Sequence, residues 1–229
     1  MGLPLILSLV FGAGANAAAN LRRVADGRVW VAFAVGGGVF FVVQFVSRPL
    51  VALVSMLGGW QADGTFPSWL FVAVNVVLAE LFKLTAALVL HSAYRSPVGE
   101  ASGTGAAVGA GFAVWYESLI LSSAFQISRL ALPGGQSLVA ALVASLARVL
   151  AGSATTGLGA GLAVRGQLAG GVVLAVAAQL LLDPGLRVLL WRPWMTVAAT
   201  ALVSGVLFAW LVVWGGGRTR AVPPGSDGP

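Results

Sequence analysis

The chain has 229 residues, of which 59% are hydrophobic and 9% charged, with a mean hydropathy of +0.95. This composition excludes a soluble globular domain, in which roughly 45–50% of residues are apolar and roughly 25% are charged. The chain has no cysteine, which excludes disulfides and thiolate metal sites. Its net charge of +6 comes from arginines spread singly over predicted loops rather than gathered in one patch, so we expect no nucleic-acid partner.

Seven apolar segments follow one another along the chain. They cover residues 2–19, 29–56, 68–91, 104–126, 136–163, 168–183 and 194–214. Because a transmembrane helix needs ~20 predominantly apolar residues, they predict an all-α polytopic membrane bundle of about seven transmembrane helices. This bundle forms a single domain over residues 1–214. Residues 215–229, rich in glycine and proline, predict a disordered cytoplasmic tail.

Three of these segments have features that affect their interpretation. The first, residues 1–19, lacks the basic leader of a signal peptide, so we expect an uncleaved span, although its Ala17-Ala18-Ala19 end could imitate a cleavage site. The second is long enough to be one tilted helix or a helix that breaks at Pro49, because proline removes a backbone hydrogen bond. The sixth, residues 168–183, is the shortest.

The arginines of the loops predict the orientation, because cytoplasmic loops carry an excess of Lys and Arg. With the N-terminus outside, the cytoplasmic side holds seven arginines: Arg22, Arg23, Arg28, Arg95, Arg165, Arg218 and Arg220. The outer side then holds three: Arg129, Arg187 and Arg192. The sequence therefore favours an N-terminus outside and a C-terminus in the cytoplasm. Six tryptophans fall at predicted span ends, as an aromatic belt requires: Trp30, Trp60, Trp69, Trp191, Trp194 and Trp214.

Five charged residues lie inside the apolar segments: Arg48, Glu80, Lys83, Glu117 and Arg148. Ionisable groups in a transmembrane helix are costly, usually face the bundle interior, and by default mark a functional site. We therefore expect the activity of this protein to involve these residues.

Polar and small residues accompany these charges at helical spacing, so that each set shares one face of its helix. The pairs are Gln44 with Arg48 and Glu80 with Lys83. The stripes are Gly105, Gly109, Ala113 and Glu117; Ser145, Arg148, Gly152, Thr155 and Gly159; Gly171, Ala175, Gln179 and Asp183; and Thr196, Thr200 and Ser204. Six helices thus offer a small or polar face to a common interior. In the alternative interpretation these stripes are ordinary packing seams, and the charges only neutralise one another, as Glu80 and Lys83 could.

Five motifs, in the correct order over about residues 30–190, resemble the YhfC family of intramembrane metalloproteases, relatives of the PrsW and CAAX-protease-like proteins. They are FFVVQFVSRPL at residues 40–50, AELFK at 79–83, GAGFA at 109–113 followed by Glu117, RVLAG at 148–152, and QLLLD at 179–183. In the second motif Ala79 replaces the first residue of the Glu-Glu pair that is typical of the superfamily. Where the family places histidines, this chain has Phe112 or Ala113, Gly152 and Gln179.

The resemblance implies a bacterial cytoplasmic membrane protein in which carboxylates and imidazoles hold a catalytic water, either on a divalent metal such as zinc or through a glutamate. The only histidine, His91, lies eleven residues beyond Glu80, ~16 Å along a helix axis, so we expect an interfacial residue rather than a ligand. The remaining donors are Glu80, Glu117, Gln179 and Asp183, which suit hard cations better than zinc. The expected metal site is therefore dismantled, and Glu80 and Glu117 are its only candidate ligands.

Three hypotheses follow from this inventory. The first is an inactive relative that binds or scaffolds a membrane partner, such as a transmembrane segment of another protein, in a cavity lined by Gln44, Arg48, Lys83, Arg148, Gln179 and Asp183. The second is an active intramembrane peptidase, with Glu80 as the general base and Glu117 as a second acid or ligand. The third is a small proton- or cation-coupled transporter, although the sequence shows no inverted repeat.

Overall fold

The computed structural model describes residues 2–57, 68–130, 136–182 and 193–216, which form seven α-helices and no strand. The helices are α1 (Gly2–Ala19), α2 (Gly27–Leu57), α4 (Ser68–Ala93), α5 (Ala101–Leu130), α6 (Gln136–Val164), α7 (Leu168–Leu180) and α9 (Pro193–Gly216). Two short 3₁₀ turns, η1 (Leu21–Arg23) and η2 (Val98–Glu100), precede α2 and α5. The all-α prediction is confirmed. Most of the predicted tail, from residue 217 onward, lies outside the described residues.

Six of these helices are long and apolar enough to cross a membrane, namely α1, α2, α4, α5, α6 and α9. The seventh, α7, has 13 residues and is ~20 Å long, which is less than the ~30 Å hydrocarbon core. Within the described residues, the sixth predicted span is therefore a short helix that packs against α6 and α4 at the edge of the bundle. With six apolar helices of spanning length, the protein is an integral membrane protein.

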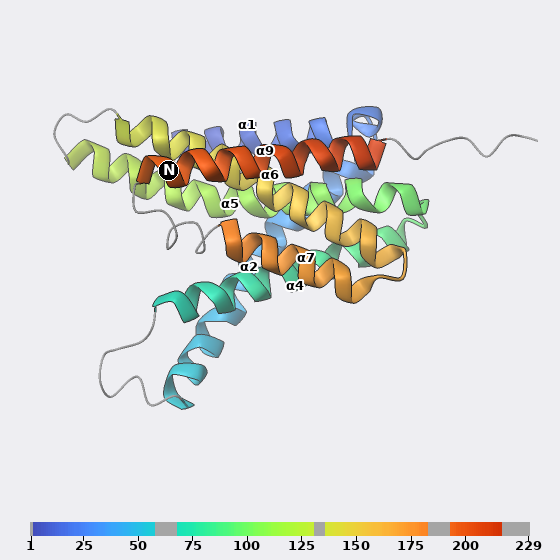
Figure 1. The fold of residues 1–229 in the computed structure, drawn as a ribbon, viewed down its shortest axis with the longest axis horizontal. Helices are drawn as coiled ribbons and strands as arrows, with labels where there is room; N and C mark the ends of the chain where they lie inside the picture. The colour runs from blue at the N-terminus through green and yellow to red at the C-terminus, as the bar shows by residue number, and fades with distance from the viewer. Residues whose placement is uncertain (1, 58–67, 131–135, 183–192, 217–229) are drawn as a thin grey trace, which may run out of the picture.

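Helix α5 occupies the centre of the bundle and contacts α1, α2, α4, α6 and α9 (Figure 1). In its most apolar window 78% of the residues are buried, against 17% for α9, which lies at the periphery. Such a central helix does not need large apolar side chains, because other helices rather than lipid surround it. Its small residues instead allow close packing, which is how helices associate in lipid.

Glycines on α5 lie directly against the backbones of neighbouring helices, as the predicted small-residue stripe requires. A Cβ added at Gly105 would lie 2.6 Å from the carbonyl oxygen of Thr156, and one at Gly109 would overlap the carbonyl of Gly152. On another face, a Cβ at Gly111 would overlap the carbonyl of Phe33 on α2. These contacts leave no room for even one methyl group, so the glycines determine how closely α2 and α6 approach α5.

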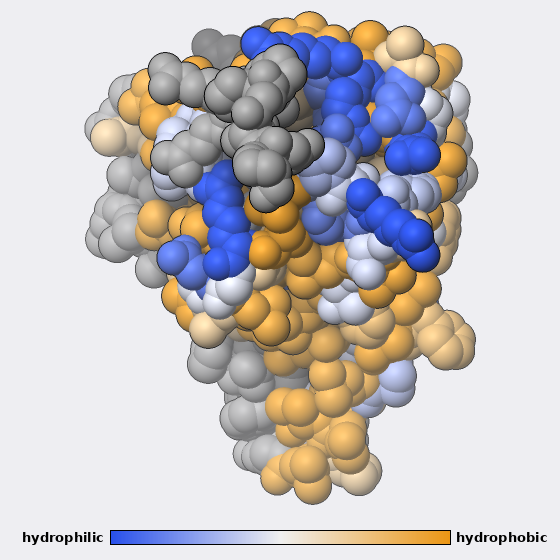
Figure 2. All heavy atoms as spheres, turned by 90° about the vertical axis from the view of Figure 1, so that its right-hand side faces the viewer, coloured by the Kyte–Doolittle hydropathy of each residue, from blue (hydrophilic) through white to orange (hydrophobic). Residues whose placement is uncertain are grey.

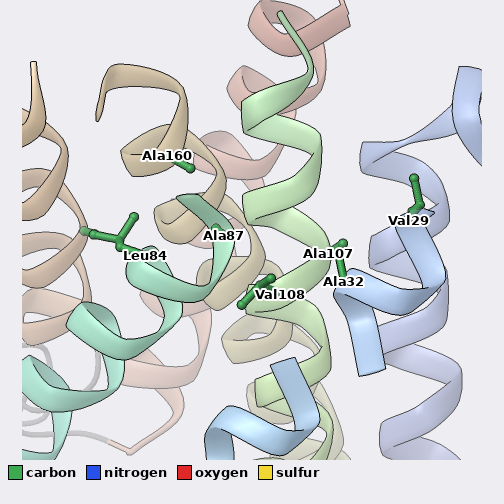
Figure 3. Close-up of a cluster of buried hydrophobic side chains, with 8 residues drawn as sticks. Val29, Ala32, Leu84, Ala87, Ala107, Val108 and Ala160 are labelled. Carbon is green, nitrogen blue, oxygen red and sulfur yellow. The ribbon is translucent and has the colours of Figure 1, made fainter. Parts of the chain in front are cut away.

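One cluster of the buried apolar core is built largely from alanines where α2, α4, α5, α6 and α7 meet (Figure 3). Its members are Val29, Ala32, Leu84, Ala87, Ala107, Val108, Ala160 and Ala175. Short side chains keep the helix backbones close together. The interior is therefore closely packed, and its polar residues are held in defined positions.

Helix α2 continues through Pro49 without a break, which decides between the two alternatives for the second segment. Proline is tolerated inside membrane helices because neighbouring groups satisfy the freed backbone carbonyl. The last turns of α2 extend away from the bundle, together with the start of α4 (Figure 1). In this part of α2, Arg48 is exposed, and Met56 and Leu57 are 63% and 77% exposed.

The loops at residues 20–26, 94–100 and 165–167 lie at the same end of the bundle, which we call the arginine-rich end (Figure 1). It carries Arg22, Arg23, Arg28, Arg95 and Arg165. Side-chain contacts tie its segments together: Arg23 pairs with Glu100, and Arg165 lies 4.0 Å from the centroid of the Trp214 ring. Figure 2, which faces this end, shows hydrophilic residues gathered on it with apolar residues around them.

We predict that the arginine-rich end faces the cytoplasm. The chain has no native cysteine, so single cysteines report their own position. Ala25→Cys, in an exposed loop of this end, should react with a membrane-impermeant maleimide only after permeabilisation, whereas Gly2→Cys should react in intact cells. The reverse labelling pattern would contradict this orientation.

The glycine contacts predict opposite effects for two substitutions on α2. A Cβ at Gly36 would lie 2.8 Å from the carbonyl carbon of Val108, whereas one at Gly38 would meet nothing within 4 Å. We expect Gly36→Ala to lower the free energy of unfolding by about 1–3 kcal/mol through overpacking. Gly38→Ala should leave it unchanged or raise it by up to about 1 kcal/mol through helix propensity. Unfolding by SDS in mixed micelles measures both values, and equal effects would contradict the packing argument.

Candidate functional site

Glu80 and Lys83 form an ion pair within α4. Lys83 Nζ donates to Glu80 Oε1, and the Thr156 hydroxyl of α6 donates to Glu80 Oε2 at 3.4 Å. Glu80 is fully buried and Lys83 is only 2% exposed. The Lys83 ammonium also lies 5.1 Å from the centroid of the Phe112 ring, a favourable position for a cation. The two residues therefore neutralise each other, as the alternative interpretation of their spacing expected.

Glu117 and Arg148 form a second ion pair, which joins α5 to α6. Arg148 Nε donates to Glu117 Oε1 at 2.7 Å, and Arg148 Nη2 donates to Glu117 Oε2 at 2.9 Å. Glu117 is fully buried, and the Arg148 side chain is 11% exposed. This parallel two-bond arrangement is the strong form of the arginine–carboxylate interaction. Sequence analysis placed both residues on interior faces but did not pair them.

A cavity of about 290 Å³ lies between these two ion pairs. Of the predicted site residues, it is lined by Gln44, Glu80, Lys83, Glu117, Arg148 and Gln179, which come from α2, α4, α5, α6 and α7. Apolar residues make up most of the remaining wall, including Val43, Val76, Ala79 and Ile120. One lining side chain, Leu119, is 48% exposed, so the cavity reaches the surface of the bundle within a membrane-spanning segment.

One predicted site residue, Arg48, is not on the cavity wall, and another, Asp183, cannot be placed relative to it. Arg48 shares a helix face with Gln44, but it is exposed and absent from the cavity wall, whereas the adjacent Ser47 is buried. The cavity role predicted for Arg48 is therefore corrected. Asp183 lies outside the described residues.

Sequence analysis missed two polar residues of the cavity wall, Asn75 and Tyr116. Asn75 is an isolated amide in an otherwise apolar stretch of α4, which is a usable signal. Tyr116 directly precedes Glu117, and its position on the wall follows only from how α5 packs against its neighbours.

The donors around the cavity do not suit a catalytic metal. Among the described residues, no three or more His, Cys, Asp or Glu side chains lie close enough together to hold an ion. Both carboxylates of the cavity wall already bind a cationic side chain. The only histidine, His91, is in the last turn of α4 at the arginine-rich end and does not line the cavity.

Comparisons with known proteins add no functional assignment: no family model, no curated protein and no solved structure matches the chain.

The Glu117–Arg148 pair predicts a large difference between single and double substitutions. Arg148→Met leaves the buried Glu117 carboxylate without the guanidinium that binds both of its oxygens, and should cost about 3–5 kcal/mol of the free energy of unfolding. Adding Glu117→Gln removes the second charge and should recover most of this loss. SDS titration measures all variants, with Arg95→Met, at an exposed position, as the control. A double variant as unstable as the single one would contradict the pairing.

Proposed function

We propose that the protein is a catalytically inactive relative of the YhfC-type intramembrane metalloproteases, which binds a membrane-embedded partner in its central cavity. The observation that carries this proposal is the pairing of both cavity carboxylates with cations. A general base must accept a proton from water, and a metal ligand must offer an oxygen to the ion. Here Lys83 neutralises Glu80, and Arg148 occupies both oxygens of Glu117.

The positions at which the resemblance expects histidines give independent support. Phe112, Ala113, Gly152 and Gln179 all line the cavity that also contains the two glutamates. These residues come from three helices and are far apart in the sequence, so random matches to short motifs would not be expected to gather at one place. Such a wall is what remains when a metal site loses its imidazoles but keeps its fold.

The size and lining of the cavity indicate what it can receive. The cavity volume of about 290 Å³ is near the lower limit of the ~300–1,000 Å³ typical of small-molecule sites. A cavity of this volume is too small to hold a whole helix, which is ~10 Å across. It suits a bulky apolar side chain or a short acyl segment. The amides of Gln44 and Gln179 offer hydrogen bonds to an uncharged polar group. Access at Leu119 allows entry from the membrane rather than from water.

Photocrosslinking within the membrane tests this proposal. Benzoylphenylalanine at Tyr116, on the cavity wall, should form a discrete adduct in native membranes that mass spectrometry identifies. Ala113→Trp should abolish the adduct by filling the cavity. Ala198→Trp, on an exposed position of α9, adds the same bulk elsewhere and should not. Thermal unfolding of each variant in detergent verifies that it is folded.

The charge pairs supply a second arm of this experiment. Replacing a whole pair, as in Glu80→Gln with Lys83→Met, avoids an unpaired buried charge and should leave the adduct intact. Adducts with bulk lipid only, or adducts that persist in Ala113→Trp, would overturn the binding proposal. A membrane substrate that is cut only while Glu80 and Lys83 are present would favour the active peptidase. Flux driven by a pH gradient in liposomes would favour the transporter.

A further inference from the structure

A second pocket, of about 500 Å³, lies at the arginine-rich end and shares no lining residue with the central cavity. It is formed by the end of α1, the turns η1 and η2, the start of α5 and the end of α9. Its wall has an apolar side and a polar side. Ala18, Ala19, Leu211, Val212 and Val213 form an apolar side, and Asn20, Arg22, Arg23, Glu100 and Ser102 form a polar side.

The polar side of this pocket is held in place by contacts between segments. The Asn20 amide donates to Asn16 Oδ1 at 3.1 Å and to the carbonyl of Gly103 at 3.1 Å, which fixes the end of α1 against α5. Arg23 Nη2 donates to Asp26 Oδ2 at 2.9 Å, and its Nη1 lies 3.1 Å from Glu100 Oε2. The backbone N–H of Arg28 and the Arg23 side chain hold the pKa of Asp26 below its usual value, so this carboxyl stays ionised at neutral pH. The pocket is therefore preformed.

The charge at this end is positive. Among the described residues, five arginines are accompanied by two carboxylates, Asp26 and Glu100, both of which lie beside Arg23. Arg22 adds a further positive charge to the pocket wall. The pocket also lies where α1 and α9 end, which is the depth of lipid headgroups for helices that span the membrane.

We propose that this pocket binds an anionic phospholipid, with its phosphate at Arg22 and Arg23 and the start of an acyl chain against Val212 and Val213. The apolar side distinguishes such a lipid from a free anion, which would gain nothing from that surface. The positive charge distinguishes it from a zwitterionic lipid. The side chain of Val213 is 73% exposed, so an acyl chain can leave the pocket along α9 into the bilayer.

Native mass spectrometry of the full chain in detergent tests this site with three probes: dioleoylphosphatidylglycerol, dioleoylphosphatidylcholine and inorganic phosphate. We expect one phosphatidylglycerol to bind in preference to phosphatidylcholine. Arg22→Gln should weaken this binding about fivefold, the effect of one arginine near an anionic headgroup. Arg95→Gln removes the same charge from the same end but from outside the pocket, and should leave binding unchanged. Glu100→Gln frees Arg23 from one carboxylate and should strengthen binding.

Three outcomes would overturn the lipid site. Equal binding of phosphatidylglycerol and phosphatidylcholine would show that the negative charge of the lipid does not contribute to binding. Equal losses in Arg22→Gln and Arg95→Gln would indicate diffuse attraction to the whole end rather than a pocket. Competition by phosphate at the lipid concentration would indicate a site for a free anion. Because Arg22→Gln and Glu100→Gln are expected to act in opposite directions, a general loss of folding cannot produce the predicted pattern.

Discussion

The close contact between Gly109 on α5 and Gly152 on α6 determines the geometry of the central site. A side chain at Gly109 would overlap the Gly152 carbonyl, so the two backbones touch at this point. From there Glu117 lies eight residues along α5, about 12 Å, and Arg148 lies four residues along the antiparallel α6 in the same direction, about 6 Å. Long helical side chains lean toward the N-terminus of their own helix, which directs Arg148 toward Glu117 and covers the remaining distance. The interhelical ion pair thus depends on the register that close glycine contacts, including the one at Gly109, impose on α5 and α6.

The same geometry explains which parts of the structure could be predicted from the sequence. The helices could be predicted from the sequence, because the length and composition of each apolar segment indicate a helix on their own. The Glu80–Lys83 pair could also be predicted, because both residues lie on one helix three positions apart. The Glu117–Arg148 pair could not, since it depends on how far α5 and α6 are shifted along each other. The exposure of Arg48 could not be predicted for a related reason: a shared helix face with Gln44 does not show whether a neighbouring helix covers that face four residues further on.

Helix α5 connects the two sites of the molecule. Its first turn supplies Ser102 and Gly103 to the pocket at the arginine-rich end, and its middle supplies Phe112, Ala113 and Glu117 to the central cavity. Between them, Gly105, Gly109 and Gly111 press against α6 and α2. A helix packed this closely on several sides moves as a rigid element if it moves at all. The position of the pocket at the arginine-rich end and the shape of the central cavity therefore both depend on α5.

The two buried ion pairs are not explained by stability alone. In many proteins the free-energy cost of removing two charges from water exceeds the gain from their mutual attraction. Well-packed apolar residues of similar size often stabilise a fold as well as a buried ion pair, or better. In a bundle that otherwise packs alanine against glycine, the chain nevertheless keeps four charged side chains around one cavity. Each pair is neutral as a unit, yet each presents a local dipole to whatever enters the cavity. The binding proposed above would use these dipoles to orient an uncharged polar group.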